Sequence, residues 1–594
     1  MKELASLVLV RYPAFSAFFL SVLTLAPFAS GGLDVTDPGF HLANQQMVGR
    51  IGLLYIIEQP YWWLSDVIGW AWLSFTELLN LGLLGARMGG ILLFAFSAAI
   101  AVSIVSKHVL SHWLIPLSVL CVAPFYSSFL SLISYDSVPA FLCLIGIYLY
   151  LEGIFGVEKT GAIYALGAGG VFFLLLLSRL PAVTVLALPI LIMMAALIID
   201  RIKFRTSVVV GTTAYSVIFI LALSFYLYLS SSGLLSKIQA NQPLDTNYTV
   251  DFVFAAIKAQ WSLIWEWCMW FALPLLALAA AQLFKPVQRI KAVVPVLATV
   301  MVLSYTWVSY RSQLQDIFAG TLNQLLFMCL LICTTAILTA SLWHERDARS
   351  RSLLFRIIVI VGFGLALPII VSAGSSAGIA KLQFGGYLVP PLAVALLISI
   401  ARLRPGIEQR ALSIASGALT LLAIIFAEYH LYAHGVFRDT SDRQRLSWPL
   451  NEPKLVGIKT TPERAQSVDD LVSALNSKPI PRGATVLVYR ETPLVHYLIN
   501  DEPFRNWVWP DLLPLDEIQR GMRAMCDKNS APYLVVRALE PTGNLIWGGQ
   551  AHIQSFAPPR QIEKYEAIDK AVEDCGFRSV YKNVDFEILM KAKR

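Results

Sequence analysis

The apolar residues of this chain gather in blocks of about twenty, the length that an α-helix needs to cross the hydrocarbon core of a bilayer. Because 57% of the 594 residues are hydrophobic and only 14% are charged, the chain has more apolar surface than a soluble protein of this length could bury. We therefore predict a polytopic α-helical membrane protein with about thirteen transmembrane helices. The blocks lie at 14–30, 85–106, 112–132, 138–155, 161–178, 180–199, 206–229, 262–284, 292–309, 318–342, 354–373, 384–402 and 411–429.

The basic residues between these blocks predict the orientation of the helices, because cytoplasmic loops are enriched in Lys and Arg. If the N-terminus is cytoplasmic, the loops on its side hold 17 basic residues and the opposite loops hold 7. An odd number of crossings then leaves the chain after residue 430 outside the cytoplasm. Residues 1–30 also resemble a cleaved signal peptide, with a basic start, an apolar run and small residues at its end. Removing them would take away the first span that sets this orientation.

The net charge of +7 does not indicate a nucleic-acid-binding protein. The excess of basic residues lies on the predicted cytoplasmic rim, where anionic lipid accounts for it. Residues 430–594 carry 22 basic and 21 acidic side chains, which leaves no electrostatic footprint for DNA or RNA.

The sequence predicts two parts, a transmembrane domain over residues 1–429 and a soluble α/β domain over residues 430–594. Within the first part, residues 31–84 form a long outer loop whose Trp-rich, partly acidic composition is typical of interfacial helices. In the second part, buried strands are expected at 485–490 and 533–539, amphipathic helices at 468–476, 515–527 and 561–575, and a closing strand or hairpin at 580–590.

Cys526 and Cys575 both fall in the predicted outer domain, where an oxidising compartment permits a disulfide. The other cysteines lie in apolar spans, where small buried thiols are ordinary packing residues. The pair is therefore a candidate disulfide.

Ionisable residues crowd the start of the outer loop, in Asp34-Val-Thr-Asp37-Pro-Gly-Phe-His41. Asp37 precedes Pro38, and an Asp-Pro pair can simply open a helix, with the carboxylate capping free amides. Capping does not account for Asp34 and His41 in the same short stretch. Carboxylates at the mouth of a helix bundle are placed to meet a substrate whose tail lies in lipid. We therefore take Asp37 and Asp34 as candidate catalytic residues and His41 as a candidate substrate contact.

Two further outer turns carry charge. Asp136, with Tyr135 beside it, precedes one span and could cap that helix, orient an acceptor or hold a divalent ion through its oxygens. Arg179 lies at an outer tip in Ser-Arg-Leu-Pro-Ala, where it could snorkel to the interface or bind a phosphate with paired donors. All three residues are candidate substrate contacts.

These elements resemble the GT-C superfamily of integral-membrane glycosyltransferases that use polyprenyl-phosphate-linked sugars, including mannosyltransferase-like and arabinosyltransferase-like members. Members typically have a catalytic Asp in a long first outer loop flanked by interfacial helices, an acidic turn after the third span and a basic-Phe/Leu-Pro element after the fifth. Asp34 or Asp37, Asp136 and Arg179 stand at the matching positions. The chain departs from the common Asp-Glu pair by having Asp37-Pro38, so which Asp is the base stays open, with Asp37 preferred.

The resemblance implies an inverting hexosyl or pentosyl transferase of the cell envelope, multi-pass in a bacterial inner (plasma) membrane, with a periplasmic or extracellular C-terminal domain. Its partners would be a polyprenyl-phosphate-linked sugar donor, a lipid, glycan or protein acceptor, and membrane lipids. Asp37 would be the base and Arg179 the phosphate partner, with His41 and Asp34 orienting the base or the acceptor. No cofactor is required by this chemistry, although a divalent metal ion could take part. Alternatives are a transporter or flippase for lipid-linked sugars, and an inactive assembly or sensor protein.

Overall fold

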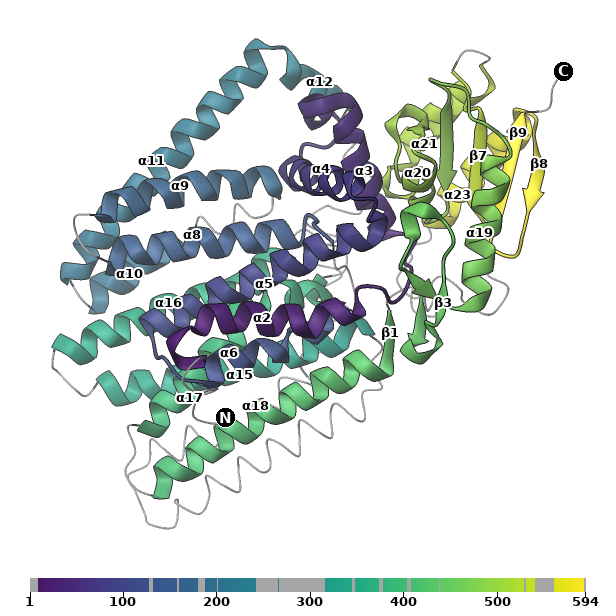
Figure 1. Ribbon diagram of the computed structural model, residues 1–594. Helices are drawn as coiled ribbons and strands as arrows, with labels where there is room; N and C mark the ends of the chain where they lie inside the picture. The colour runs from purple at the N-terminus through teal and green to yellow at the C-terminus, as the bar shows by residue number, and fades with distance from the viewer. Residues whose placement is uncertain are drawn as a thin grey trace.

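The computed structural model describes residues 9–127, 132–156, 160–179, 187–199, 201–241, 265, 316–343, 348–372, 378–402, 407–436, 439–527, 530–539 and 560–591. A bundle of long apolar helices occupies one side of the molecule and a five-stranded sheet the other (Figure 1). Two helices from the segment between α2 and α5 lie where the bundle meets the sheet.

The bundle is built from helices that follow the apolar blocks of the sequence. Seven helices of the described ranges are long and apolar enough to cross a membrane, so we treat the chain as a multi-pass membrane protein. The bundle elements are α2 (Pro13–Leu25), α5 (Gly82–His108), α6 (Leu114–Leu117), η3 (Ser118–Cys121), α7 (Ala123–Ser127), α8 (Ser137–Phe155), α9 (Gly161–Ser178), α10 (Leu188–Ile199), α11 (Arg201–Ser231), α15 (Asp316–Trp343), α16 (Ala348–Ser372), η8 (Gly378–Leu388), α17 (Val389–Arg402) and α18 (Ile407–Ala433).

The comparison with the thirteen expected spans is partial. Shorter apolar helices cover Pro13–Phe28, Leu114–Tyr126, Leu188–Ile199 and Ser416–Tyr432, where spans were also expected. The expected spans at 262–284 and 292–309 lie outside the described residues. The number of crossings therefore stays a prediction.

Small residues allow the helices of the bundle to approach closely. A Cβ atom on Gly146 of α8 would lie 2.4 Å from the ring of Phe172 on α9, so glycine is needed at this crossing. Large apolar side chains such as Leu23, Ile163 and Phe219 are instead exposed on the outside of the bundle. That distribution is the one expected of helices whose outer faces meet lipid.

The segment between α2 and α5 forms helices outside the bundle. These are α3 (Asp37–Ile51), η2 (Gly52–Ile57) and α4 (Trp63–Leu78), and the short α12 (Leu234–Asn241) lies near η2. A Cβ atom on Gly69 of α4 would lie 2.2 Å from Gln45 of α3, so the two helices are in close contact. Interfacial helices were expected over residues 31–84, and the structure has helices within that range.

The C-terminal sheet has the strand order β6-β5-β7-β9-β8. Strand β5 pairs in parallel with β6 and β7, whereas β9 pairs antiparallel with β7 and β8. The strands expected at 485–490 and 533–539 are present as β5 and β7, and the chain ends in the hairpin of β8 and β9. The strands are β5 (Thr485–Tyr489), β6 (Glu502–Pro503), β7 (Leu534–Ala538), β8 (Phe577–Lys582) and β9 (Phe586–Lys591).

Helices cover both faces of this sheet, and the sheet separates two apolar cores. One face packs against α19 (Pro462–Asn476) and α20 (Leu494–Ile499), and the other against α21 (Leu515–Met522) and α23 (Arg560–Asp574). A disulfide joins Cys526 to Cys575, with Cα atoms 4.8 Å apart. The connection to the bundle contains two small antiparallel pairs, β1 (His434–Val436) with β2 (Thr440–Asp442) and β3 (Trp448–Pro449) with β4 (Lys459–Thr460).

The core beneath α19 and α20 also includes Leu33, Val35 and Leu42 from the outer loop. The C-terminal part is thus packed directly on the segment that carries the candidate acids. The domain boundary at residue 430 stays a prediction, since α18 runs through it to Ala433.

Candidate active site

Asp37 is the first residue of α3, and its carboxylate is not used as a cap. Thr36 occupies the N-cap position, and Pro38 fills the first turn, where a missing N–H costs nothing. Asp37 is half-buried, and its carboxylate makes no hydrogen bond with any described residue. The capping interpretation therefore does not account for this side chain, which keeps its oxygens available as proton acceptors.

Asp34 has a different environment. It is 1% exposed, and its Oδ1 accepts hydrogen bonds from the backbone N–H of Thr36 at 2.8 Å and from the Thr36 hydroxyl at 2.5 Å. A short Asp side chain that bonds the backbone two residues later stabilises a local turn. Asp34 thus shapes the backbone that leads into α3.

The backbone before Asp37 is held from both sides. On the bundle side, the guanidinium of Arg87 donates to the carbonyl oxygens of Ala29 at 2.8 Å and Gly32 at 2.7 Å. On the C-terminal side, the N–H of Gly32 donates to the carbonyl of Lys459 at 2.7 Å, and the N–H of Lys459 donates to Ser30 at 2.7 Å. This segment is therefore fixed between the bundle and strand β4.

Contacts with the C-terminal part continue up to α3. The N–H of Leu33 donates to Asp439 at 2.6 Å, and the N–H of Leu494 donates to the carbonyl of Val35 at 3.0 Å. At Gly39 the backbone of α3 approaches α20 so closely that a Cβ atom would lie 2.2 Å from the Leu494 nitrogen. The position of Asp37 thus depends on residues more than 400 positions later in the chain.

His41 lies one turn after Asp37 on the same face of α3. The imidazole is 1% exposed, and neither ring nitrogen has a hydrogen-bond partner among the described residues. Burial lowers the pKa of His41 to about 4, although the carboxylates of Asp37 and Asp136 act in the opposite direction. The ring is therefore neutral at physiological pH and lies within electrostatic reach of both acids.

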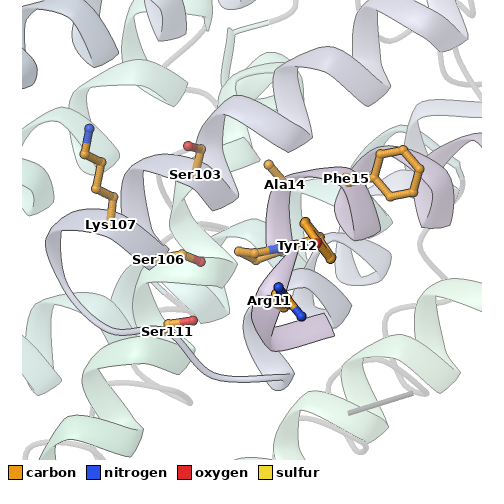
Figure 2. A pocket seen from close by; sticks show the side chains of 9 residues that line it. Arg11, Tyr12, Ala14, Phe15, Ser103, Ser106, Lys107 and Ser111 are labelled. Carbon is orange, nitrogen blue, oxygen red and sulfur yellow. The ribbon is translucent and has the colours of Figure 1, made fainter. Parts of the chain in front are cut away.

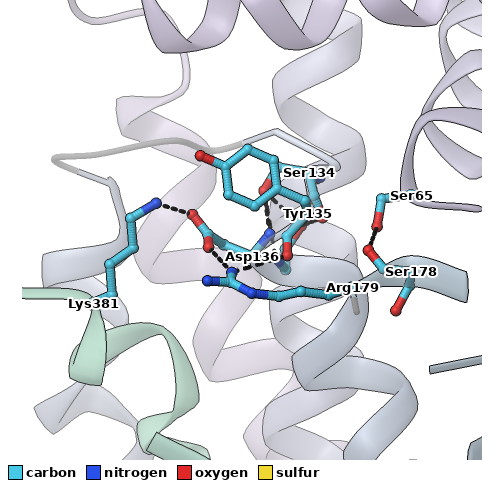
Figure 3. Close-up of polar contacts among 8 residues, drawn as sticks. Ser65, Ser134, Tyr135, Asp136, Ser178, Arg179 and Lys381 are labelled. Atoms are coloured by element: carbon cyan, nitrogen blue, oxygen red, sulfur yellow. Dashed lines mark hydrogen bonds and ion pairs between the residues drawn. The ribbon is translucent and has the colours of Figure 1, made fainter. Parts of the chain in front are cut away.

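Asp136 is the centre of a buried ionic cluster (Figure 3). Its carboxylate accepts from Arg179 Nη1 at 2.5 Å and from Lys381 Nζ at 2.5 Å, and all three side chains are nearly inaccessible to solvent. Burial alone raises the pKa of Asp136, but the two adjacent cations outweigh it and hold the pKa below its ordinary value. The cluster carries one negative and two positive charges, a net positive charge next to His41.

Three separate helix ends bring this cluster together. Asp136 is the N-cap residue of α8, Arg179 follows the last residue of α9, and Lys381 lies in η8 before α17. The Asp136 side chain makes no capping hydrogen bond to α8, so the capping alternative fails here as well. Of the residues expected from sequence, the structure thus brings Asp136 and Arg179 together.

Tyr135 lies between this cluster and His41. Its ring centroid is 4.9 Å from the His41 ring and 5.5 Å from the Trp62 ring. The cationic groups of Arg179 and Lys381 lie over the same ring, at 5.4 and 5.0 Å from its centroid. Tyr135 therefore connects the acidic end of α3 with the two cations.

The helix α4 closes the same region from another side. The Ser65 hydroxyl donates to the carbonyl of Ser178 at 3.0 Å, which fixes α4 next to Arg179 (Figure 3). Its neighbour Asp66 is 1% exposed, and burial raises the pKa of Asp66 well above its ordinary value. Phe40 of α3 packs against Trp62 and against Trp509 of the C-terminal part, with ring centroids 6.0 and 5.5 Å away.

Sequence reasoning missed Lys381 and Asp66 as members of this region. Lys381 was counted only as one basic residue on the outer side, although a lysine immediately before an apolar span is a signal that could have been used. Asp66 looked like an interfacial acid of an amphipathic helix. Neither sequence position indicates its distant partners.

The described residues do not fit a metal ion at Asp136. Both carboxylate oxygens already accept from a cation, and no group of three or more His, Cys, Asp or Glu side chains in the described ranges could hold a metal. The chemistry below therefore uses the residues of the chain alone.

Comparisons with known proteins found similarities only at the level of structure. No protein-family model matches the chain, and no curated protein is significantly similar to it. Solved structures that are similar include the archaeal oligosaccharyltransferase AglB from Archaeoglobus fulgidus in complex with an inhibitory peptide and a dolichol-phosphate. It has 10% sequence identity and a TM-score of 0.49, covering 98% of this chain and 75% of that chain.

ArnT from Cupriavidus metallidurans is also similar. In the apo state it has 12% identity and a TM-score of 0.40, covering 98% of this chain and 97% of that chain. Bound to undecaprenyl phosphate it has 13% identity and a TM-score of 0.36 over the same shares. Every one of these TM-scores is below 0.5, so the similarities do not assign a function to this chain.

Proposed function

We propose that this chain is a membrane glycosyltransferase that transfers a sugar from a polyprenyl-phosphate donor to an acceptor hydroxyl at the outer face of the membrane, with inversion at the anomeric carbon. One observation carries the proposal. The rings of His41 and Tyr135 lie against each other between two groups of opposite charge. On the His41 side is the carboxylate of Asp37, which has no hydrogen-bond partner among the described residues. On the Tyr135 side are the buried cations of Arg179 and Lys381.

The cation pair suits the phosphate of the donor. A lipid phosphate leaves with negative charge, and a cation held in a dry site stabilises developing charge far better than one in water. Asp136 keeps Arg179 and Lys381 side by side despite their mutual repulsion. Lys381 thereby joins Arg179 as the proposed phosphate-binding group.

Asp37 suits the role of base better than Asp34. The Asp34 carboxylate is buried and engaged by Thr36, whereas Asp37 is partly accessible and is not engaged. In the proposed step Asp37 takes the proton of the acceptor hydroxyl, and the acceptor oxygen forms a bond to the anomeric carbon. The bond from that carbon to the phosphate oxygen breaks, and polyprenyl phosphate leaves with the electron pair.

Neutral His41 is suited to orienting the acceptor. Its ring nitrogens can donate and accept a hydrogen bond without adding a charge that would compete with Asp37. If Asp37 deprotonates an acceptor on the face of the sugar opposite the leaving phosphate, the acceptor oxygen attacks from that face, which gives inversion. The sugar, hexosyl or pentosyl, and the acceptor, which is a lipid, a glycan or a protein, are not specified by these residues.

The location follows from two features of the chain. The Lys and Arg bias assigns the site to the face opposite the cytoplasm. The Cys526–Cys575 disulfide belongs to the same side and requires an oxidising compartment. Both support a C-terminal domain outside the cytoplasm, and we propose that the chain lies in a bacterial inner membrane with this domain periplasmic or extracellular.

The test reconstitutes the purified chain in vesicles, offers it a panel of polyprenyl-phosphate sugars together with lipid, glycan and peptide acceptors, and measures release of polyprenyl phosphate. Asp37→Asn should lower transfer by about 10²–10⁴-fold, the usual contribution of a general base, and should leave donor binding intact. Asp34→Asn is the matched control and should retain more activity than Asp37→Asn. A lipid-linked sugar that crosses the membrane unchanged, with no release of polyprenyl phosphate by any donor, would favour a flippase instead.

A further inference from the structure

A pocket of about 450 Å³ is formed by the start of α2, the last turns of α5 and the connection after α5 (Figure 2). Lys107 of this pocket is 25 residues after Gly82, where α5 meets the C-terminal part, so the pocket is about 35 Å along the helix from that contact. It therefore lies towards the opposite end of the bundle from the candidate site. Its lining includes Arg11, Tyr12, Phe15, Ser103, Ser106 and Lys107.

The charge available in this pocket comes from Arg11. The ammonium of Lys107 pairs with Glu152 at 2.7 Å, so Lys107 contributes mainly its apolar stem to the wall. Arg11 makes no ion pair with any described residue, and its guanidinium lies 5.6 Å from the centroid of the Tyr12 ring. A planar guanidinium held over an aromatic ring is a good partner for a phosphate.

Three serines line the same pocket as Arg11. Ser103 and Ser106 lie on α5 one turn apart, and Ser111 follows in the connection, where its hydroxyl donates to the carbonyl of Val10 at 3.4 Å. The Ser106 hydroxyl is buried and bonds no atom of the described residues. Ser103 and Ser106 therefore offer neutral donors that complement the positive charge of Arg11.

The surroundings of the pocket are basic on one side and apolar on the other. His112 lies just after Ser111. Burial lowers the pKa of His112, and the positive charge of the nearby Arg402 lowers it further. Along α2, Phe15, Phe19 and Leu23 are exposed on the outside of the bundle, where acyl chains would run. The Lys and Arg bias assigns this rim to the cytoplasmic leaflet, which is rich in anionic lipid.

We propose that this pocket binds the phosphodiester headgroup of an anionic phospholipid from the cytoplasmic leaflet. Arg11 pairs with the phosphate, the serine hydroxyls donate to its remaining oxygens, and the acyl chains lie along the exposed apolar face of α2. This site is separate from the proposed transferase site and does not depend on its chemistry.

The test measures lipid binding to the purified full chain by native mass spectrometry. Phosphatidylglycerol and phosphatidylcholine with the same acyl chains are compared, and inorganic phosphate is added as a competitor. Arg11→Gln should weaken retention of phosphatidylglycerol by about fivefold and should weaken retention of phosphatidylcholine less, because the choline cation of that lipid already offsets its phosphate charge. Ser106→Ala should weaken the same lipid by a smaller factor.

Arg351→Gln is the matched control, because Arg351 is an exposed arginine at the start of α16 that does not line the pocket. It should retain phosphatidylglycerol like the unchanged chain. Equal losses in Arg11→Gln and Arg351→Gln would mean that the whole rim attracts lipid, and would overturn the site. Displacement of the lipid by millimolar inorganic phosphate would overturn the assignment of a lipid and identify a free-phosphate site.

Discussion

The two halves of the candidate site are held in place by different forces. The half that carries Asp37 is fixed by backbone hydrogen bonds and close packing against residues 439–494 of the C-terminal part. The half that carries Arg179 and Lys381 is fixed by ion pairs to Asp136 inside the bundle. The proposed base is thus positioned by packing, and the proposed phosphate-binding cations are positioned by ion pairs. Substitutions in the two halves should therefore impair the protein in different ways.

The energetics of the two halves differ accordingly. Each backbone hydrogen bond around residues 30–35 contributes only about 1 kcal/mol net, and the segment is held by several of them. Removing one such bond should be tolerated. The ionic cluster has a single carboxylate that accepts from two buried cations, so the loss of that one group removes both ion pairs at once.

The largest effect is expected from Asp136→Asn. Two buried cations would then lose the carboxylate that they share, and breaking a buried pair in this way typically costs about 3–5 kcal/mol of unfolding free energy. Donor binding should fall as well, because the cations would no longer be held together. Thermal unfolding in mixed micelles and binding of a polyprenyl-phosphate sugar measure the two losses.

Glu152→Gln provides the matched control for this prediction. Glu152 lies at the other end of α8 and also accepts from two side chains, Lys107 at 2.7 Å and His108 at 3.1 Å. Because Lys107 can turn to solvent, the loss of stability should be smaller, and donor binding should be unchanged. Equal loss of donor binding in the two variants would mean that the Asp136 cluster has no special relation to the phosphate.

The next effect is expected from Gly39→Ala, which acts on the other half. The added Cβ atom would collide with the backbone of Leu494 and push α3 away from α20. A displacement of about 1 Å at a catalytic group can cost about a hundredfold in kcat, and we expect a loss of that size with an unchanged KM for the donor.

Gly170→Ala on α9 is the control, because nothing lies within 4 Å of its added Cβ atom. It should leave kcat unchanged and slightly favour the helix. If Gly39→Ala instead weakened donor binding and left kcat intact, the separation of the site into a base half and a phosphate half would be wrong.

The part of this site that the sequence could predict is the part encoded in neighbouring residues. Apolar blocks of about twenty residues predicted helices, short apolar runs predicted β5 and β7 as buried strands, and the crowding of Asp34, Asp37 and His41 marked the outer loop. Each of these signals lies within a window of a few residues.

The contacts that separate Asp34 from Asp37 could not be predicted in the same way. Asp34 and Asp37 have the same side chain three positions apart, and only the fold shows that one is buried against Thr36 and the other is not. Lys381 meets Asp136 across 245 positions, and no local pattern indicates that pairing. The role of the C-terminal part in holding Asp37 was hidden for the same reason.

A smaller effect, dependent on pH, is expected from His41, which lies between the two halves. Its pKa is about 4 in the folded chain against 6.5 ordinarily, so between these values the unfolded chain binds more protons than the folded one. Stability should therefore fall as the pH is lowered from 6.5 towards 4. At pH 5 the shift at His41 should lower the unfolding free energy by about 2 kcal/mol relative to its value at neutral pH.

His41→Gln should remove the part of this pH-dependent loss of stability that comes from His41. The measurement compares the unfolding midpoints of the unchanged protein and of His41→Gln at pH 8 and at pH 5. The other titratable groups are the same in the two proteins, so their contributions cancel in this comparison. A difference between the proteins that is the same at pH 8 and pH 5 would show that His41 is not buried in its neutral form.

The smallest effect is expected from Arg445→Ala, which sharpens the distinction between buried and exposed charge within the C-terminal part. Arg445 and Glu463 lie 3.7 Å apart with more than half of each side chain exposed, whereas the neighbouring pair of Arg464 and Asp439 is buried and bonds the backbone of Leu33. Water and salt screen the exposed pair, so Arg445→Ala should change the unfolding free energy by no more than about 0.5 kcal/mol and leave transfer unchanged. Kinetics at low and at high salt provide the measurement, and a salt-dependent loss of transfer in this variant would mean that surface charge, and not packing, holds the Asp37 half in place.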